Sequence, residues 1–263
     1  MSSQYLPTVV ALAREAGERI LEVYASDFAV TSKDDKSPLT AADLAAHHTI
    51  VAGLETLTPD IPILSEESAS VPFAERGAWD RYWLVDPLDG TREFVKRNGE
   101  FTVNIALIDG DAPVLGVVHV PVTGVTYYAS VENGAFRQDG ETKPHAIATR
   151  TPPSTPPVIV GSRSHAGESL AAFLDRLGEH QLVSVGSSLK LCLVAEGIAD
   201  CYPRFGLTSE WDTAAAQCVA EVSGATVTDL EGNRLRYNRK DSLLNPHFIV
   251  SGDPAAVWPL QDG

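Results

Sequence analysis

The chain has 263 residues, of which 44% are hydrophobic, and a formal net charge of −15. This length and composition predict a globular protein that buries a large core, as one large domain or two smaller lobes. The acidic charge argues against binding to a nucleic acid polymer or to an anionic membrane surface.

The three cysteines, Cys192, Cys201 and Cys218, form no Cys-x-x-Cys spacing. A sparse, odd set argues against a disulfide framework and predicts a reducing compartment, which places the protein in the cytoplasm. No run approaches the ~18 apolar residues of a membrane span. Arg14 and Glu15 interrupt the first apolar segment, so we expect no signal peptide.

Two helices are expected at the start of the chain. Apolar residues recur at helical spacing over 4–25, and a second helix is expected to begin at Thr40. The inward face of the second helix is expected to carry Leu44, His48, Val51 and Leu54. Asp43 follows Thr40 at the spacing of a capping box. Helix capping and a functional role therefore remain alternatives for Asp43.

The segment 61–65 predicts a short strand that ends at the adjacent acids Glu66 and Glu67. Adjacent residues on a strand point to opposite faces, so only one of these acids is expected to enter a site. For Glu67, a supporting position beside the site and a solvated surface position are alternatives.

The strongest signal follows an apolar run at 82–85, where the sequence reads Asp-Pro-Leu-Asp-Gly-Thr over 86–91. Pro87 lacks an N–H, so we expect strand pairing to stop there. A turn at this proline would bring the carboxylates of Asp86 and Asp89 to one place. The two groups would repel each other unless a cation lay between them.

Oxygen ligands on such a turn suit Mg²⁺, which proteins hold through a few carboxylates and a substrate phosphate. The backbone N–H groups of Gly90 and Thr91 follow directly and are expected to bind a phosphate oxygen. The stretch therefore predicts a metal and phosphate site at the end of a strand. An acidic surface turn is the alternative, because Asp-Gly is a common turn dipeptide.

The next part of the chain predicts an antiparallel sheet, because apolar runs flank Asp-Gly and Asn-Gly turns. The strands are expected at 101–108, 114–120, 125–130 and 135–138. The proline-rich run at 151–157 is the clearest linker. It divides the chain into an N-terminal α+β lobe, 1–150, and a C-terminal α/β lobe, 151–263.

Strands and helices alternate in the second lobe. Strands are expected at 158–162, 182–185, 198–202, 225–230 and 248–251, and helices at 169–177, 189–196 and 212–222. The Gly-Ser-Ser turn at 186–188 could bind an anion through free N–H groups, or simply cap the helix. Asp212 stands at a helix start, where it also suits a cap.

Two motifs resemble signatures of the inositol monophosphatase superfamily. They are Asp-Pro-Leu-Asp-Gly-Thr at 86–91 and Trp-Asp-Thr-Ala-Ala at 211–215, followed by Gly-Ala at 224–225. The continuation at 93–101, Glu-Phe-Val-Lys-Arg-Asn-Gly-Glu-Phe, is similar to one branch, the bacterial 3′(2′),5′-bisphosphate nucleotidases. The similarity runs over most of the chain, and the paired motifs are specific. It implies a layered αβαβα sandwich, with a larger antiparallel sheet in the first lobe.

The resemblance also implies the ligands of two or three Mg²⁺ ions. Glu66, Asp86 and the carbonyl of Leu88 would hold one ion. Asp86, Asp89 and Asp212 would hold a second, so that Asp86 bridges the two. Two such ions can stabilise both the attacking and the leaving oxygen of an in-line displacement.

The remaining implied roles concern water and substrate. Asp43 lies in a Thr-x-Ala-Asp motif and, with Thr91, would position the attacking water and take its proton. Lys190 and Arg204 are candidates for binding a phosphate, with a surface charge as the alternative. The full set of implied substrate contacts is Glu66, Leu88, Asp89, Gly90, Thr91, His165, Ser187, Lys190, Arg204 and Asp212.

The implied activity is hydrolysis of 3′-phosphoadenosine 5′-phosphate to AMP and phosphate, which supports sulfate assimilation and is inhibited by Li⁺. The resemblance implies a monomer or a homodimer. It implies a cytoplasmic location, with peripheral association at the inner membrane as the alternative. Three other interpretations remain. They are another phosphatase of the superfamily, acting on inositol or fructose phosphates; a haloacid-dehalogenase-type phosphatase, whose acids are spaced Asp-x-Asp; and a non-catalytic metal- or nucleotide-binding protein.

Overall fold

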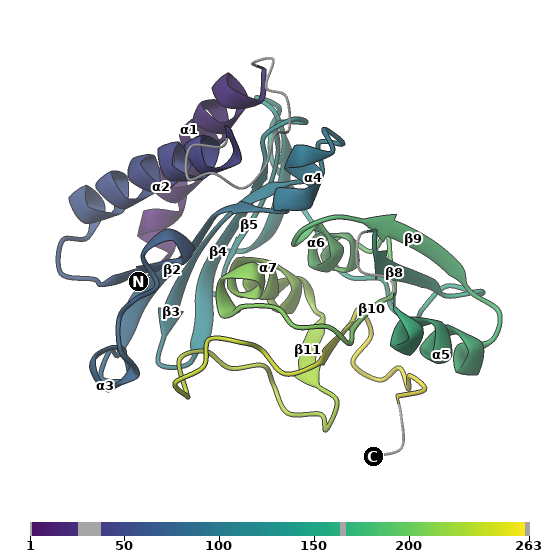
Figure 1. The fold of residues 1–263 in the computed structure, drawn as a ribbon. Helices are drawn as coiled ribbons and strands as arrows, with labels where there is room; N and C mark the ends of the chain where they lie inside the picture. The colour runs from purple at the N-terminus through teal and green to yellow at the C-terminus, as the bar shows by residue number, and fades with distance from the viewer. Residues whose placement is uncertain (1, 26–37, 164–166, 261–263) are drawn as a thin grey trace.

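Helical layers and sheets alternate through the molecule (Figure 1). The computed structural model describes residues 2–25, 38–163 and 167–260. Helices α1 (Leu6–Tyr24) and α2 (Pro38–Leu57) cover one face of a seven-stranded sheet. Helix α7 (Glu210–Ser223) covers the other face, and α6 (Leu189–Ala195) packs beside α7. A five-stranded sheet follows, with α5 (Glu168–Leu177) on its outer face. The predicted αβαβα arrangement is confirmed.

The seven-stranded sheet follows the chain order from β1 to β7. Strand β1 runs parallel to β2, and every later pair is antiparallel. The predicted hairpins are therefore confirmed, whereas the two-residue strand β7 was not predicted. The bounds are β1 (Ile63–Ser65), β2 (Arg81–Asp89), β3 (Thr102–Asp109), β4 (Ala112–Val120), β5 (Val125–Ser130), β6 (Gly134–Asp139) and β7 (His145–Ala146).

Short helical pieces surround this sheet and carry parts of the site. The 3-10 turn η1 precedes α1, and the 3-10 turn η2 follows β1. A short helix lies before β2 and another directly after it. The bounds are η1 (Ser2–Tyr5), η2 (Glu66–Ser68), α3 (Phe73–Arg76) and α4 (Thr91–Val95). Glu66 and Glu67 therefore lie on a helical turn, and the expectation that they alternate on a strand is wrong.

Helix α2 corrects two expectations about the second helix. It begins at Pro38, whose fixed φ and missing N–H suit the first turn, so Thr40 lies inside the helix and not at the N-cap position. Its buried face carries Ala42, Ala46, Ile50 and Leu54, whereas Leu44 is 38% exposed, and His48 is exposed too. The close crossing with α1 sets this face, since a Cβ at Gly53 would lie 2.2 Å from Leu12 Cδ2.

Helix α7 joins the two sheets, because it packs on β4 and also contacts β11. A Cβ on Gly116 of β4 would lie 2.2 Å from the carbonyl oxygen of Ala215, so glycine permits this close approach. The small side chains on the buried face of α7 are Ala214, Ala215, Ala216, Cys218 and Ala220. The middle layer is therefore held directly against the large sheet.

The five-stranded sheet has the order β11-β12-β10-β8-β9, with β10, β8 and β9 parallel to one another. Its strands are β8 (Val158–Ser162), β9 (Gln181–Val185), β10 (Cys201–Arg204), β11 (Thr226–Asp229) and β12 (Phe248–Ser251). The expected strand at 198–202 begins later, because the N–H groups of Ile198 and Ala199 still donate to the Leu193 carbonyl. The other expected strands are confirmed.

The run 151–157 connects β7 to β8 and thus links the two sheets. Buried Asp200 holds this segment, accepting hydrogen bonds from Arg150 Nε (2.8 Å), Ser154 Oγ (2.6 Å) and the Val158 N–H (2.7 Å). The division into lobes 1–150 and 151–263 stays a prediction. Within the described ranges, no helix is long and apolar enough to cross a membrane.

Candidate active site

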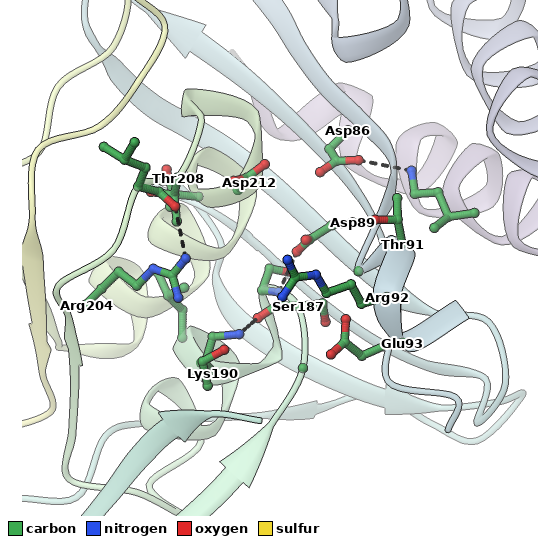
Figure 2. A pocket seen from close by; sticks show the side chains of 18 of the residues that line it. Asp86, Asp89, Thr91, Arg92, Glu93, Ser187, Lys190, Arg204, Thr208 and Asp212 are labelled. Atoms are coloured by element: carbon green, nitrogen blue, oxygen red, sulfur yellow. Dashed lines mark hydrogen bonds between the residues drawn. The ribbon is translucent and has the colours of Figure 1, made fainter. Parts of the chain in front are cut away.

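A cavity of about 300 Å³ lies between the end of β2, the turn before α6 and the start of α7. Figure 2 shows that acidic side chains from β2 and α7 and basic side chains from α6 and β10 point into it. Ten of the predicted site residues line this one cavity: Glu66, Asp86, Leu88, Asp89, Gly90, Thr91, Ser187, Lys190, Arg204 and Asp212. His165 lies outside the described residues.

The end of β2 brings two carboxylates together by a bulge. Asp86 pairs with Asn104 and Asp89 with Thr102, so β2 holds an extra residue between these pairs. The Leu88 N–H turns back and donates to Asp86 Oδ1 at 3.0 Å. Strand pairing thus continues past Pro87, and the expected stop there is wrong, because the proline is accommodated in the bulge.

Helix α7 supplies a third carboxylate to the same place. Asp212 lies in its first turn and accepts the Ser209 N–H at 2.8 Å through Oδ2, in a capping box with Ser209 as the N-cap. One ligand oxygen each from Asp86, Asp89 and Asp212 lie within 4.8 Å of one another. Capping therefore fixes the direction of Asp212 while the residue still lines the cavity.

Burial and mutual repulsion shape the electrostatics of these acids. Burial, followed by the charge of Asp89, raises the pKa of Asp212 to about 7. Burial also raises the pKa of Asp86 well above its usual range, with Asp89 and Glu66 adding to the shift. Hard oxygen ligands that repel one another this strongly fit a divalent cation such as Mg²⁺.

Asp43 is not among the residues that line the cavity. It is buried, and its Oδ1 has no hydrogen-bond partner among the described residues. Burial, and then the charges of Glu67 and Glu66, raise the pKa of Asp43 to about 8. Glu67 itself is exposed and does not line the cavity, so a supporting role for it stays a prediction.

The basic side chains lie across the cavity from Asp86 (Figure 2). Lys190 is 6% exposed, donates to the carbonyl oxygen of Ser187, and has its Nζ 5.6 Å from the ring centroid of Tyr202. Burial lowers the pKa of Lys190 to about 8, although nearby Asp89 opposes this shift. Arg204 donates to the Leu207 carbonyl at 2.9 Å.

The Gly-Ser-Ser turn before α6 argues against one of its two alternatives, an anion site made of free N–H groups. The Gly186 N–H donates to Glu100 Oε2 at 2.9 Å, and the Ser188 N–H donates to Asp89 Oδ2 at 2.6 Å. Both amides are therefore occupied by carboxylates of the other sheet. The Ser187 hydroxyl lies between them, buried and without a partner in the described part of the chain.

The sequence did not predict a group of polar residues that hydrogen-bond to one another next to the site. The Ser188 hydroxyl donates to Asn104 Oδ1 at 2.8 Å and lies 2.9 Å from the Thr102 hydroxyl. Arg92 and Tyr202 also line the cavity. These residues carry no motif, because their contacts join segments far apart in the chain. The one available signal was the position of two polar residues in an otherwise apolar strand.

The chain belongs to the Inositol monophosphatase family, whose profile matches residues 1–256. A solved structure of an inositol monophosphatase from Zymomonas mobilis shares the fold, with a TM-score of 0.77 at 23% identity. It covers 96% of this chain, and the match covers 94% of that one.

More similar relatives belong to one kind of enzyme. The 3′(2′),5′-bisphosphate nucleotidase CysQ of Escherichia coli (strain K12) is 54% identical, over 94% of this chain and 99% of its own. The enzyme of the same name from Haemophilus influenzae is 36% identical, over 98% of this chain and 96% of its own. The crystal structure of CysQ from Bacteroides thetaiotaomicron has a TM-score of 0.85 and 41% identity. It covers 94% of this chain and 97% of that one.

Proposed function

We propose that this chain is a Mg²⁺-dependent 3′(2′),5′-bisphosphate nucleotidase that hydrolyses 3′-phosphoadenosine 5′-phosphate to AMP and phosphate. The observation that carries the proposal is that one cavity holds both acidic and basic side chains. The carboxylates of Asp86, Asp89 and Asp212 converge in it, and Lys190 and Arg204 line the wall across from Asp86 (Figure 2). Such a cavity suits a substrate with one phosphate to cleave and another to hold.

The carboxylate end fits two or three Mg²⁺ ions. We assign Glu66, Asp86 and the Leu88 carbonyl to one ion, and Asp86, Asp89 and Asp212 to a second. When bound there, Mg²⁺ supplies Lewis acidity that lowers the pKa of water and stabilises negative charge on the phosphate. The fit rests on the shared direction of three carboxylates and on their mutual repulsion without a cation.

The attacking water is assigned to Thr91 and Asp43. The Thr91 side chain lines the cavity beside Asp89 (Figure 2) and can orient a water through its hydroxyl. Asp43 does not line the cavity, and we assign it, on the family resemblance, to take the proton of this water together with Thr91. The backbone at Gly90 has φ +98°, which turns the chain into α4 and presents its first N–H groups to the cleaved phosphate.

The other end of the cavity is assigned to the phosphate that is kept. Arg204 can bind a phosphate through two N–H groups, and Lys190 contributes a point charge. The unpartnered Ser187 hydroxyl offers a third contact. We assign His165 to the nucleoside, on the family resemblance alone. We further propose a cytoplasmic monomer or homodimer whose activity supports sulfate assimilation.

A panel assay tests this function. Phosphate release is measured with 3′-phosphoadenosine 5′-phosphate, inositol monophosphate and fructose bisphosphate, each with Mg²⁺ and with a chelator. We expect the highest kcat/KM on the bisphosphate nucleotide, and only with Mg²⁺. A higher value on either sugar phosphate would assign the chain to another activity of the family. No release from any of the three would indicate a binding protein.

A further inference from the structure

Glu100 joins the two sheets beside the cavity. It lies just before β3, an inner strand of the large sheet, and its side chain reaches Arg163 and Gly186, which follow two strands of the small sheet. Its Oε1 and Oε2 accept hydrogen bonds from Arg163 Nη2 and Nε, both at 2.7 Å, and Oε2 also accepts the Gly186 N–H at 2.9 Å. Arg163 in turn donates to the Ser184 carbonyl at 2.6 Å. A guanidinium and a carboxylate joined by two hydrogen bonds have a defined mutual orientation, and their interaction is stronger than that of a neutral hydrogen bond.

The backbone of Glu100 is also confined between two glycines of the site. A Cβ on Gly90 would lie 3.3 Å from the Glu100 carbonyl oxygen, and a Cβ on Gly186 would lie 2.9 Å from the same atom. Gly90 opens α4 next to the carboxylate cluster, and Gly186 opens the turn before α6. Glu100 therefore contacts both the metal-binding end and the phosphate-holding end of the cavity.

The turn held by Glu100 has a conformation that needs support. Ser187 has φ +47°, a left-handed conformation that costs energy in a residue other than glycine. Glu100 fixes the turn at Gly186, and Asp89 fixes it at Ser188. Between these points, the Ser187 carbonyl accepts the hydrogen bond from Lys190 Nζ. The position of the lysine ammonium thus depends on a turn that two carboxylates hold.

We infer that Glu100 is a positioning residue for substrate binding, which holds the Gly186 turn so that Ser187 and Lys190 face the kept phosphate. This inference rests on the proposed function, because it takes the 5′-phosphate as the group that Lys190 contacts. Glu100 itself does not line the cavity. Its loss should therefore weaken substrate binding more than it slows the chemical step.

The chain offers a closely matched control pair. Glu221 and Arg234 form a two-pronged ion pair with bonds of 2.9 and 2.5 Å, and Glu221 also accepts from Gln217 Nε2 at 3.0 Å. Its side-chain exposures, 18% for Glu221 and 43% for Arg234, resemble the 21% and 45% of Glu100 and Arg163. This pair lines no part of the cavity. Glu221→Ala therefore removes the same chemistry without touching the turn.

The test compares Glu100→Ala, Glu100→Gln and Glu221→Ala. The first readout is steady-state hydrolysis of 3′-phosphoadenosine 5′-phosphate. We expect KM to rise roughly ten- to a hundredfold in Glu100→Ala, the value of a charged hydrogen bond, and at least about threefold in Glu100→Gln. kcat should stay within about threefold of the parent chain. Glu221→Ala should change neither constant. An unchanged KM in both Glu100 variants, or an equal rise in Glu221→Ala, would overturn the inference.

The second readout is amide hydrogen exchange at Gly186, which does not depend on activity. Exchange should be at least about tenfold faster in Glu100→Ala than in the parent chain, and unchanged in Glu221→Ala. If the parent chain fails to hydrolyse the nucleotide, the proposed function is wrong, and exchange alone then decides whether Glu100 holds the turn. Unchanged exchange at Gly186 would refute the positioning role, whatever the kinetics.

Discussion

Removing one carboxylate from the cluster should stabilise the metal-free protein. Asp86→Asn takes away the charge of a fully buried residue whose ligand oxygen lies within 4.8 Å of those of Asp89 and Asp212. At this distance and an effective dielectric constant of about 20, each pair of ionised acids repels by roughly 3 kcal/mol. Proton uptake by the neighbours limits the gain, so we expect about 1–3 kcal/mol at pH 8.

The assay is thermal unfolding with a chelator and with saturating Mg²⁺. In the chelator, Asp86→Asn should melt higher than the parent chain by at least about 2 °C, because a domain of this size gains roughly 2–4 °C per kcal/mol. The amide keeps the hydrogen bond from the Leu88 N–H, since its Oδ1 remains an acceptor. With saturating Mg²⁺ the parent chain should melt higher than Asp86→Asn, because the ion binds the intact cluster more tightly than the cluster that lacks one carboxylate. Activity of Asp86→Asn should be lost.

Asp200→Asn is the matched control for this experiment. Asp200 is equally buried, but it accepts hydrogen bonds from Arg150, Ser154 and Val158, and these bonds lower its pKa. Its neutralisation should destabilise the protein under both conditions. If Asp86→Asn melts below the parent chain in chelator, as Asp200→Asn should, the acids of the cluster do not repel as argued. If Mg²⁺ raises the melting temperature of Asp86→Asn as much as that of the parent chain, the assignment of Asp86 as a metal ligand is refuted.

Three further predictions concern acid stability, the nucleophile and inhibition. Burial lowers the pKa of His119 to about 4, so the unfolded chain binds a proton that the folded chain excludes. The free energy of unfolding should therefore fall by up to ~3 kcal/mol between pH 6.5 and 4, and urea titrations should show a flatter profile in His119→Gln. In ¹⁸O-labelled water, a single turnover should place one solvent oxygen in the phosphate and none in the enzyme; label in an aspartate would support a phospho-enzyme. Li⁺ at millimolar concentration should inhibit phosphate release, and indifference to it would weaken the assignment of the metal site.

Much of the fold was predictable because its signals are local. Apolar runs beside Asp-Gly and Asn-Gly turns predicted strands β3 to β6. The inward face of α2 was predicted only in part, because Leu54 is buried but Leu44 and His48 are exposed. Its register depends on the crossing with α1 at Gly53 and Leu12, a contact between helices that periodicity alone does not specify.

In the candidate site, too, features within one short segment were predictable, whereas contacts between segments far apart in the chain were not. The motif at 86–91 predicted that Asp86 and Asp89 converge, but not the bulge that brings this about. For the turn at 186–188, free N–H groups and a simple helix cap were alternatives. Glu100 and Asp89 occupy two of the N–H groups, and no local pattern predicts a carboxylate that arrives from another sheet.

The central claim is that one cavity binds two phosphates of one nucleotide, and the double variant Lys190→Ala with Arg204→Ala tests it most directly. The measurement is kcat/KM on 3′-phosphoadenosine 5′-phosphate and on 3′-AMP, which lacks the 5′-phosphate. Each charged hydrogen bond is worth roughly 1.5–3 kcal/mol. The account therefore predicts a loss on the bisphosphate that exceeds the loss on 3′-AMP by at least about tenfold. Equal losses on the two substrates would contradict it.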